Sequence, residues 1–279
     1  MRQIRRLLQT RWSGQAVNMP QVFFMHIPKT AGSSVHAALS AHFPQERVPN
    51  SFMLAWRDPE RFKKYDFLGG HVARNNFTYV QLVSGLEENY RTISFVRRPQ
   101  DQLASHLAWV RHLSDPENED SFEQTFPAAR NLSRNLQKVD FSDPADLKRF
   151  FETMGDMARS LFDNCMARYF ETLWADQKMT KEHAEKAVEA MAFFECIGVV
   201  ERYEDSMNLI NHIMGWPKPE KLDHRNALPQ RYGLDISDER ILEVFEPYIK
   251  YDKLIYAAAV KRLEAQLAEH DILPKSVSD

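Results

Sequence analysis

The sequence predicts an α/β fold with a central parallel sheet and additional flanking helices. Three mostly apolar runs and a shorter fourth read as strands, and segments of helical periodicity follow them. Strands that alternate with helices favour a parallel sheet, because parallel neighbours need a crossover connection. The 279 residues and the 43% apolar content allow one sizeable core, and no shift in composition marks a second domain.

The first predicted strand covers residues 22–27 and leads into a tight loop. Pro28 and Gly32 break the apolar run. Ser33 and Ser34 stand where a helix cap belongs, so we expect one of them to cap a helix that runs through residues 35–42. The order strand, loop, helix is therefore the first unit of the fold.

Two more predicted strands follow. Residues 65–71 form a short strand that ends in a glycine pair, and residues 77–86 are expected to be helical. Residues 91–96 form a second clear strand, closed by Arg97, Arg98 and Pro99. A helix over residues 100–112 completes this second strand–helix unit.

The middle of the chain is predicted to be mainly helical. Residues 115–123 hold five acids and read as a solvated loop. The basic residues after it either balance that charge or face an anionic acceptor, and we favour surface charges; they are Arg130, Arg134, Lys138, Lys148 and Arg149. Apolar spacing predicts one helix over residues 157–174, with Asn164 and Arg168 on its polar face.

The last third predicts a third clear strand and the closing helices. The strand covers residues 195–200, between helices over 181–194 and 201–214. We interpret Glu201 and Arg202 as a structural ion pair. A polar loop over 221–232 precedes two closing helices, 238–248 and 252–269. The predicted organisation is a basic arm over 1–20, a single domain over 21–273 and a disordered tail over 274–279.

Composition excludes several classes of function. The net charge of −3 argues against a general nucleic-acid binder. Cys165 and Cys196 give no metal-ligand spacing and no disulfide framework, so we expect free, buried thiols and no metal. No apolar run approaches the roughly 20 residues that a transmembrane helix needs. We therefore expect no membrane-spanning segment.

The loop after the first strand has the chemistry of a phosphate site. A tight loop before a helix directs backbone N–H groups and the positive end of the helix dipole at one point. Lys29 adds a positive charge, and the hydroxyls of Thr30, Ser33 and Ser34 add donors. The order differs from G-x-x-x-x-G-K-[ST], because Lys29 precedes Gly32.

The run Pro-Lys-Thr-Ala-Gly-Ser-Ser resembles the 5′-phosphosulfate loop of sulfotransferases that use 3′-phosphoadenosine 5′-phosphosulfate (PAPS). It is most similar to the branch that includes heparan sulfate 2-O-sulfotransferase. The resemblance implies a three-layer P-loop-like fold. Golgi members carry a membrane anchor near their N-terminus, and this sequence shows no such segment after Met1, so we expect a soluble, cytoplasmic, bacterial enzyme. The loop residues that it assigns to the donor are Lys29, Thr30, Ala31, Gly32, Ser33 and Ser34.

A second segment carries the same resemblance. Residues 93–105 resemble the 3′-phosphate segment of these enzymes, where an arginine at a strand end and a serine eight residues later hold the phosphate. Those positions are Arg97 and Ser105. A guanidinium offers a fixed fork of donors to phosphate oxygens, which fits this role. Arg225 falls in the loop that closes over the nucleotide in the family, so it is a further candidate donor contact.

The candidate base is His71. The stretch Gly69-Gly70-His71-Val72 resembles the family's His-Gly-His-Val segment, whose second histidine takes the acceptor proton. The first histidine is Gly69 here, so we expect no support from a second imidazole. The ordinary histidine pKa of roughly 6.5 suits a general base near neutral pH.

The implied reaction is sulfuryl transfer from PAPS to the hydroxyl of an acceptor, a saccharide or a glycolipid, without metal. Lys29 would act as a second catalytic group, because it stands where negative charge develops on the leaving oxygen. Two alternatives stay open. One is a small-molecule or nucleotide kinase with a similar loop, and the other is a relative that binds the nucleotide without catalysis. The acceptor and the oligomeric state do not follow from the sequence.

Overall fold

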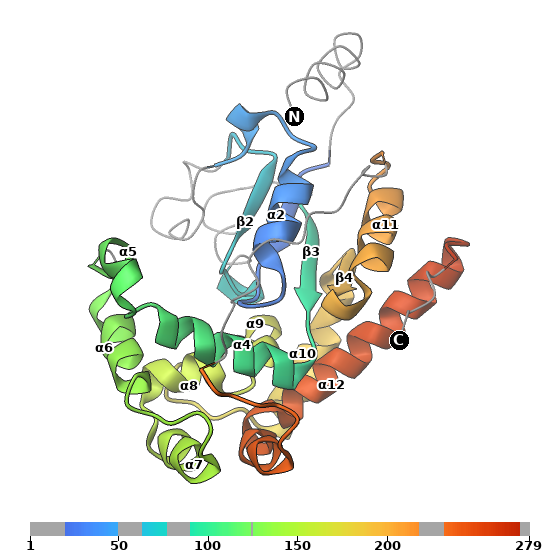
Figure 1. Ribbon diagram of the computed structural model, residues 1–279. Helices are drawn as coiled ribbons and strands as arrows, with labels where there is room; N and C mark the ends of the chain where they lie inside the picture. The colour runs from blue at the N-terminus through green and yellow to red at the C-terminus, as the bar shows by residue number, and fades with distance from the viewer. Residues whose placement is uncertain (1–19, 50–62, 77–89, 124, 218–231, 274–279) are drawn as a thin grey trace.

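A four-stranded, all-parallel sheet forms the centre of the molecule (Figure 1). The computed structural model describes residues 20–49, 63–76, 90–123, 125–217 and 232–273. The strands are β1 (Val22–Met25), β2 (Phe67–Gly70), β3 (Arg91–Val96) and β4 (Cys196–Val199), in the order β2-β1-β3-β4. The α/β class with a parallel sheet is therefore confirmed, and each predicted strand run contains one of these strands.

The strand register brings three strand ends together. Met25, the last residue of β1, pairs with Gly70 of β2 on one side and with Ser94 of β3 on the other. All four residues of β1 are completely buried, as expected for a central strand of a parallel sheet. The chain segments that follow β1, β2 and β3 therefore leave the sheet side by side, at the edge where open parallel sheets usually bind ligands.

The helices connect these strands and form a second, helical part of the molecule. α2 (Gly32–Ser40) follows β1, and Figure 1 shows it in front of the sheet. α4 (Pro99–His112) follows β3, and α11 (Tyr203–Ile213) follows β4 and packs against it. The remaining α-helices are α5 (Glu119–Glu123), α6 (Pro127–Leu136), α7 (Pro144–Thr153), α8 (Asp156–Phe162), α9 (Cys165–Phe170), α10 (Lys181–Ala190) and α12 (Glu239–Glu269).

Two hydrophobic cores are joined by α12. The first core surrounds the sheet, and the second lies among α4, α6, α7 and α8. Phe245 on the N-terminal half of α12 belongs to the second core, and Leu263 on its C-terminal half belongs to the first. At 31 residues, α12 replaces the two closing helices that the sequence predicts, so that prediction is wrong.

The continuity of α12 depends on Asn164. Pro247 lies inside α12 and removes one backbone donor there. Asn164 satisfies the turn that follows the proline: its Oδ1 accepts hydrogen bonds from the N–H groups of Tyr251 (2.8 Å) and Asp252 (3.3 Å), and its Nδ2 donates to the carbonyl of Pro247 (3.4 Å). Its own N–H donates to the carbonyl of Tyr248 at 2.7 Å. A side chain thus fills the gap that a proline opens in the helix.

The same residue explains why the helix predicted over residues 157–174 is wrong. Asn164 adopts a left-handed conformation (φ 51°) and separates α8 from α9. Asp252 of α12 then caps the new helix end, accepting from the N–H groups of Met166 (3.2 Å) and Ala167 (2.8 Å). Asn164 and Arg168 are buried, not on a polar face, and Arg168 pairs with Asp163 at 2.6 Å.

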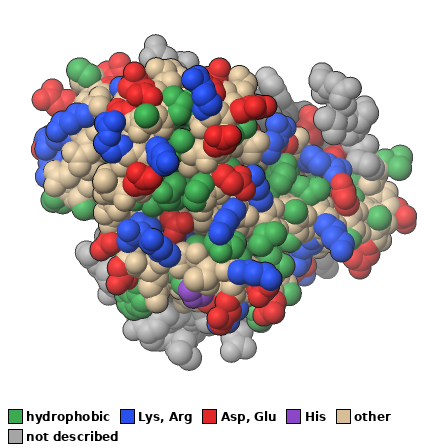
Figure 2. Space-filling model, turned by 90° about the horizontal axis from the view of Figure 1, so that it is seen from below, with side chains coloured by type: hydrophobic (Ala, Val, Ile, Leu, Met, Phe, Trp, Pro, Cys, Tyr) green, Lys and Arg blue, Asp and Glu red, His purple; other side chains and the backbone are tan. Residues whose placement is uncertain are grey.

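Smaller predictions have mixed outcomes. The acidic stretch 115–123 is not an open loop, because a 3-10 turn (Pro116–Asn118) and α5 lie within it. Arg130 and Arg149 form surface ion pairs with Glu123 and Asp146, both at 2.7 Å. Figure 2 shows acidic and basic side chains intermixed on the face seen from below.

The cysteines and the membrane prediction can also be compared with the structure. Cys165 and Cys196 are buried and free, as expected. None of the helices within the described ranges combines the length and the apolar character needed to cross a bilayer. The basic arm except for residue 20, the helix over 77–86, the loop over 221–231 with Arg225, and the tail lie outside the described residues.

Candidate functional site

The loop after β1 is built from backbone conformation. Lys29 (φ 65°) and Ala31 (φ 59°) are both left-handed, and Ala31 is the residue before the first turn of α2. The helix therefore begins at Gly32 without a side-chain cap, so the prediction that Ser33 or Ser34 caps it is wrong. The reason is conformational. The left-handed backbone at Ala31 leads directly into the helix, so no residue adopts the extended conformation that a capping serine needs.

This backbone directs free donors toward the end of the sheet. In the described part of the chain, no backbone carbonyl accepts from the N–H groups of residues 29–33. Thr30 is fully buried, and its hydroxyl donates to the carbonyl of Ile27 at 2.9 Å, which fixes the turn. Ser33 is exposed and Ser34 is buried. Successive N–H groups in such a turn form a concave anion-binding nest at a helix N-terminus.

Lys29 extends over the neighbouring helix. Its Nζ lies 5.8 Å from the ring centroid of Trp109 on α4, and that indole is 39% exposed. Partial burial, together with the charge of Arg97, lowers the pKa of Lys29 to about 8. The ammonium is therefore less well solvated than an ordinary surface lysine, and an incoming anion would stabilise it.

Arg97 ends β3 and reaches back to the same loop. Its Nη1 donates to the carbonyl of Lys29 at 3.3 Å, and its backbone N–H contacts the sulfur of Met166 on α9 at 3.5 Å. Asp101, one turn into α4, lies 4.0 Å from Nη2. Ser105 and Trp109 follow Asp101 at four-residue steps, so the three share one face of α4. The structure thus brings Arg97, Lys29 and that helix face together.

His71 follows β2 and lies beside the loop. Its Nδ1 is 2.8 Å from the carbonyl oxygen of His26, which can only accept a hydrogen bond. Nδ1 must therefore carry the proton, and Nε2 is left as the basic nitrogen. The residue is exposed, but packing around the ring and the charge of Lys29 lower its pKa, partly offset by the His26 contact. The imidazole is consequently neutral at physiological pH.

A second imidazole lies beside His71. The ring of His26 lies 4.2 Å from the ring of His71, centroid to centroid. Burial, followed by the neighbouring basic groups, lowers the pKa of His26 to about 2, so it stays neutral. A methyl group on Gly32 would meet His26 Nε2 at 1.6 Å, which shows how closely the ring covers the loop. The expectation that no second imidazole assists His71 stays a prediction, although an imidazole lies next to it.

His36 of α2 occupies the space next to Gly69. A methyl group on Gly69 would lie 2.9 Å from His36 Cδ2 and 3.1 Å from the ring of Phe67. A histidine at this position, as in the resembling family, would need His36 to move. The glycine at position 69 thus has a local packing reason, because His36 fills the place that a larger side chain would take.

Several residues near the loop carry no motif signal. The side-chain amide of Gln102 donates to the carbonyl of Pro28 at 3.0 Å. His106 is fully buried in α4 with no partner for Nδ1, and burial together with the charge of Lys29 lowers its pKa to about 3. Both point from α4 toward the loop side of the sheet by their i, i+4 spacing. The four-residue step between Gln102 and His106 is a sequence signal that could have found them together.

Other candidate residues do not join this constellation. Glu201 accepts from the Arg98 N–H at 2.9 Å and from Tyr256 at 3.1 Å, whereas Arg202 pairs with Asp205 at 2.8 Å. Both are structural, but they do not form the pair predicted from the sequence. His112, Asp115 and Glu117 place ligand atoms within 4.8 Å of one another, yet Asp115 already binds His112 and Tyr232.

No protein-family model matches the chain, and no curated protein matches it at a significant level. The geometry at the carboxyl ends of β1, β2 and β3 is therefore the evidence on function. It combines an amide nest, a lysine, an arginine and a neutral histidine with a free Nε2. Such a set can bind an anion and remove a proton beside it.

Proposed function

We propose that the protein is a PAPS-dependent sulfotransferase with a three-layer P-loop-like fold. The observation that carries the proposal is the convergence of three groups on one loop: the free amides of residues 29–33, the guanidinium of Arg97 and the base His71. A donor with a 5′-phosphosulfate and a 3′-phosphate needs two anion sites and an adjacent base. The motif resemblance and this arrangement support the same assignment.

In the proposed reaction, Nε2 of His71 takes the proton of the acceptor hydroxyl as its oxygen attacks the sulfur of PAPS. The S–O bond to the 5′-phosphate breaks in line, and adenosine 3′,5′-bisphosphate leaves with the electron pair. Lys29 and the loop amides stabilise the charge that develops on the bridging oxygen, which is where transition-state binding is needed. Arg97 and Ser105 hold the 3′-phosphate, and Arg225 is a further donor contact in this proposal.

The kinase alternative needs a hydroxyl and an acid for Mg²⁺. In this structure the Thr30 hydroxyl donates to the chain's own backbone, and Glu201 after β4 binds Arg98 and Tyr256. These contacts favour the sulfotransferase over the kinase. A relative that binds the nucleotide without catalysis would not need a base at the position of His71.

The deciding experiment is a thermal-shift comparison of adenosine 3′,5′-bisphosphate with ATP plus Mg²⁺, on wild type and Arg97→Ala. Ligand at about 100 times its Kd should stabilise the protein by roughly 2.7 kcal/mol. That corresponds to a few degrees for a chain of this size. We expect the bisphosphate alone to give this shift and Arg97→Ala to reduce it by about half or more. A larger shift with ATP plus Mg²⁺, or none with the bisphosphate, would overturn the proposal.

Transfer of label from PAPS to a pool of oligosaccharides separates an enzyme from an inactive binder. We expect labelled product with wild type and none with His71→Ala. Binding of the bisphosphate without any transfer or hydrolysis of PAPS would favour the inactive relative.

A further inference from the structure

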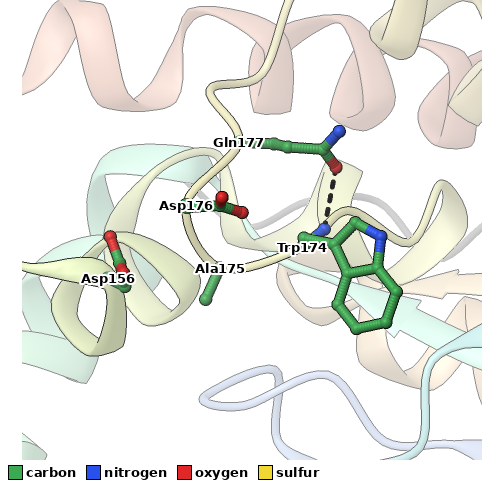
Figure 3. A pocket seen from close by; sticks show the side chains of 5 residues that line it. All are labelled: Asp156, Trp174, Ala175, Asp176 and Gln177. Atoms are coloured by element: carbon green, nitrogen blue, oxygen red, sulfur yellow. Dashed lines mark hydrogen bonds between the residues drawn. The ribbon is translucent and has the colours of Figure 1, made fainter.

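Trp174 presents its indole to solvent outside the candidate site. The side chain is 79% exposed and stands on a turn over residues 174–177, between α9 and α10. A single exposed apolar residue needs no explanation by itself. Here the exposed indole lines a hollow of about 420 Å³ together with Asp156, Ala175, Asp176 and Gln177 (Figure 3).

The turn that carries Trp174 is held rigidly from below. Within the turn, the Gln177 N–H donates to the Trp174 carbonyl, and the Trp174 N–H donates to Gln177 Oε1, both at 3.0 Å. Arg168 also donates to the Gln177 carbonyl at 2.6 Å and to the Trp174 carbonyl at 3.4 Å. Because Arg168 is itself buried against Asp163, the backbone of the turn is preorganised and loses little freedom on binding.

The polar groups that line the hollow include acceptors and a donor. Figure 3 shows Asp176 on the turn that carries Trp174, with Gln177 above the turn and Asp156 on a neighbouring helix, on the side away from the indole. Asp156 is neutralised by Arg159 at 3.0 Å. The Asp176 carboxylate and the Gln177 Nε2 have no protein partner among the described residues. The turn that exposes the indole thus also carries one acceptor and one donor that no described residue uses.

We propose that this hollow binds a saccharide. A sugar ring offers a C–H face that packs on an indole and hydroxyls that both donate and accept hydrogen bonds. A carboxylate and an amide donor on the same turn as an aromatic platform match that ligand. An organic ammonium ion would use the indole and a carboxylate. It would have no use for the amide donor, and Arg159 already cancels one of the two negative charges.

The hollow is linked to the candidate site through α9. Arg168 holds the turn, and Met166, two residues earlier on the same helix, contacts the backbone of Arg97. The turn also precedes α10, which leads into the start of β4, so it lies toward the carboxyl ends of the strands. We assign the hollow to a part of the acceptor distant from the reacting hydroxyl, and this assignment rests on the proposed function, whereas saccharide binding does not.

The test is isothermal titration of the whole protein with three neutral hexasaccharides: cellohexaose, maltohexaose and the hexamer of N-acetylglucosamine. The variants are Trp174→Ala, Trp174→Phe and Asp176→Ala. Phe126→Ala is the matched control, because Phe126 is also an exposed aromatic (56%) but does not line the hollow. None of these exposed positions leaves a core cavity, and circular dichroism checks the fold.

We expect at least one hexasaccharide to bind wild type and Phe126→Ala equally. Trp174→Ala should weaken that binding about tenfold or more, and Trp174→Phe should retain part of it. The inference is overturned if no hexasaccharide binds, if Trp174→Ala binds as wild type does, or if spermidine binds the hollow and the sugars do not. Saccharide binding without a thermal shift by adenosine 3′,5′-bisphosphate would overturn the proposed function and leave this inference standing. A thermal shift by the bisphosphate without saccharide binding would overturn this inference and leave the proposed function standing.

Discussion

The loops after β1 and β3 present hydrogen-bond donors at the sheet edge in different ways. The loop after β1 uses backbone: two left-handed residues, Lys29 and Ala31, orient free N–H groups, and its hydroxyl at Thr30 serves the turn itself. The segment after β3 uses a side chain, because Pro99 starts α4 at once and the guanidinium of Arg97 reaches back to the first loop. The first loop should therefore be sensitive to changes in backbone shape, and the second to the loss of one guanidinium.

His71 belongs to neither loop, so its substitution should separate chemistry from anion binding. We expect His71→Ala to lower turnover of PAPS by about 10²- to 10⁴-fold, because the general base is lost. Affinity for adenosine 3′,5′-bisphosphate should be unchanged. Label transfer and thermal shift measure the two effects. His212→Ala, an exposed histidine on α11, is the control. Loss of bisphosphate binding in His71→Ala would contradict the separation.

Gly32→Ala should disrupt the backbone-built loop. The added methyl group would meet His26 Nε2 at 1.6 Å, so the imidazole beside His71 must leave its place. Such overpacking costs about 1–3 kcal/mol, more than the roughly 1 kcal/mol that alanine gains in a helix. We expect lower stability in urea denaturation together with weaker bisphosphate binding.

The matched control for Gly32→Ala is Gly155→Ala. Gly155 precedes α8 with φ −77°, and a methyl group there meets nothing within 4 Å. We expect its stability to change by less than about 1 kcal/mol and its bisphosphate binding not at all. Equal effects of the two substitutions would show that His26 does not cover the loop as described.

Arg97→Ala tests the side-chain-built segment. A charge-assisted hydrogen bond contributes about 1.5–3 kcal/mol, so bisphosphate affinity should fall by roughly 10- to 150-fold. Arg97→Lys should recover only part of it, because an ammonium lacks the planar fork. Arg149→Ala, which removes an exposed arginine paired with Asp146, should bind as wild type does. Full bisphosphate affinity in Arg97→Lys would indicate that the site needs only a positive charge at this position.

The pH dependence of kcat/KM should be bell-shaped. His71 must be neutral to accept a proton, and its pKa is lowered, so activity should rise with pH and level off below the usual histidine pKa. Lys29 must be charged, and its pKa of about 8 predicts a fall as pH rises through that value. Each limb should change the rate about tenfold per pH unit. If the fall of kcat/KM at alkaline pH persists in Lys29→Arg, a group other than Lys29 causes it.

The strands and their order along the chain could be predicted because each is a short apolar run bounded by loop residues. β3 has the predicted bounds, and the other three strands lie inside their predicted ranges. The break at Asn164 could not be predicted, because residues 157–174 keep a helical apolar stripe. Asn164 leaves the helix to compensate Pro247, more than 80 residues away. Such long-range compensation leaves no local signal.

The main residues of the candidate site could likewise be predicted from motifs, but the residues packed around them could not. The sequence pointed to Lys29, Arg97 and His71 from their positions after strands. The role of His26 depends on the register of β1 with β2, in which Met25 pairs with Gly70 and places His26 beside His71. The prediction that Ser33 or Ser34 caps α2 was wrong for a different reason. The left-handed backbone at Ala31 starts the helix without a hydrogen bond from a capping hydroxyl. Dihedral angles of this kind are invisible in a list of residue types.

The smallest expected effect is also the finest test of the backbone-built loop. Ala31 holds φ 59°, which costs an alanine about 1–2 kcal/mol and a glycine nothing. Ala31→Gly should therefore stabilise the protein by up to about 1 kcal/mol, after the entropy of glycine is subtracted. The same change at Ala37, inside α2, should destabilise it by about 1 kcal/mol. Urea denaturation measures both, and equal signs would show that the left-handed turn is not populated in solution. Bisphosphate affinity should stay within twofold in Ala31→Gly, because its N–H group is retained.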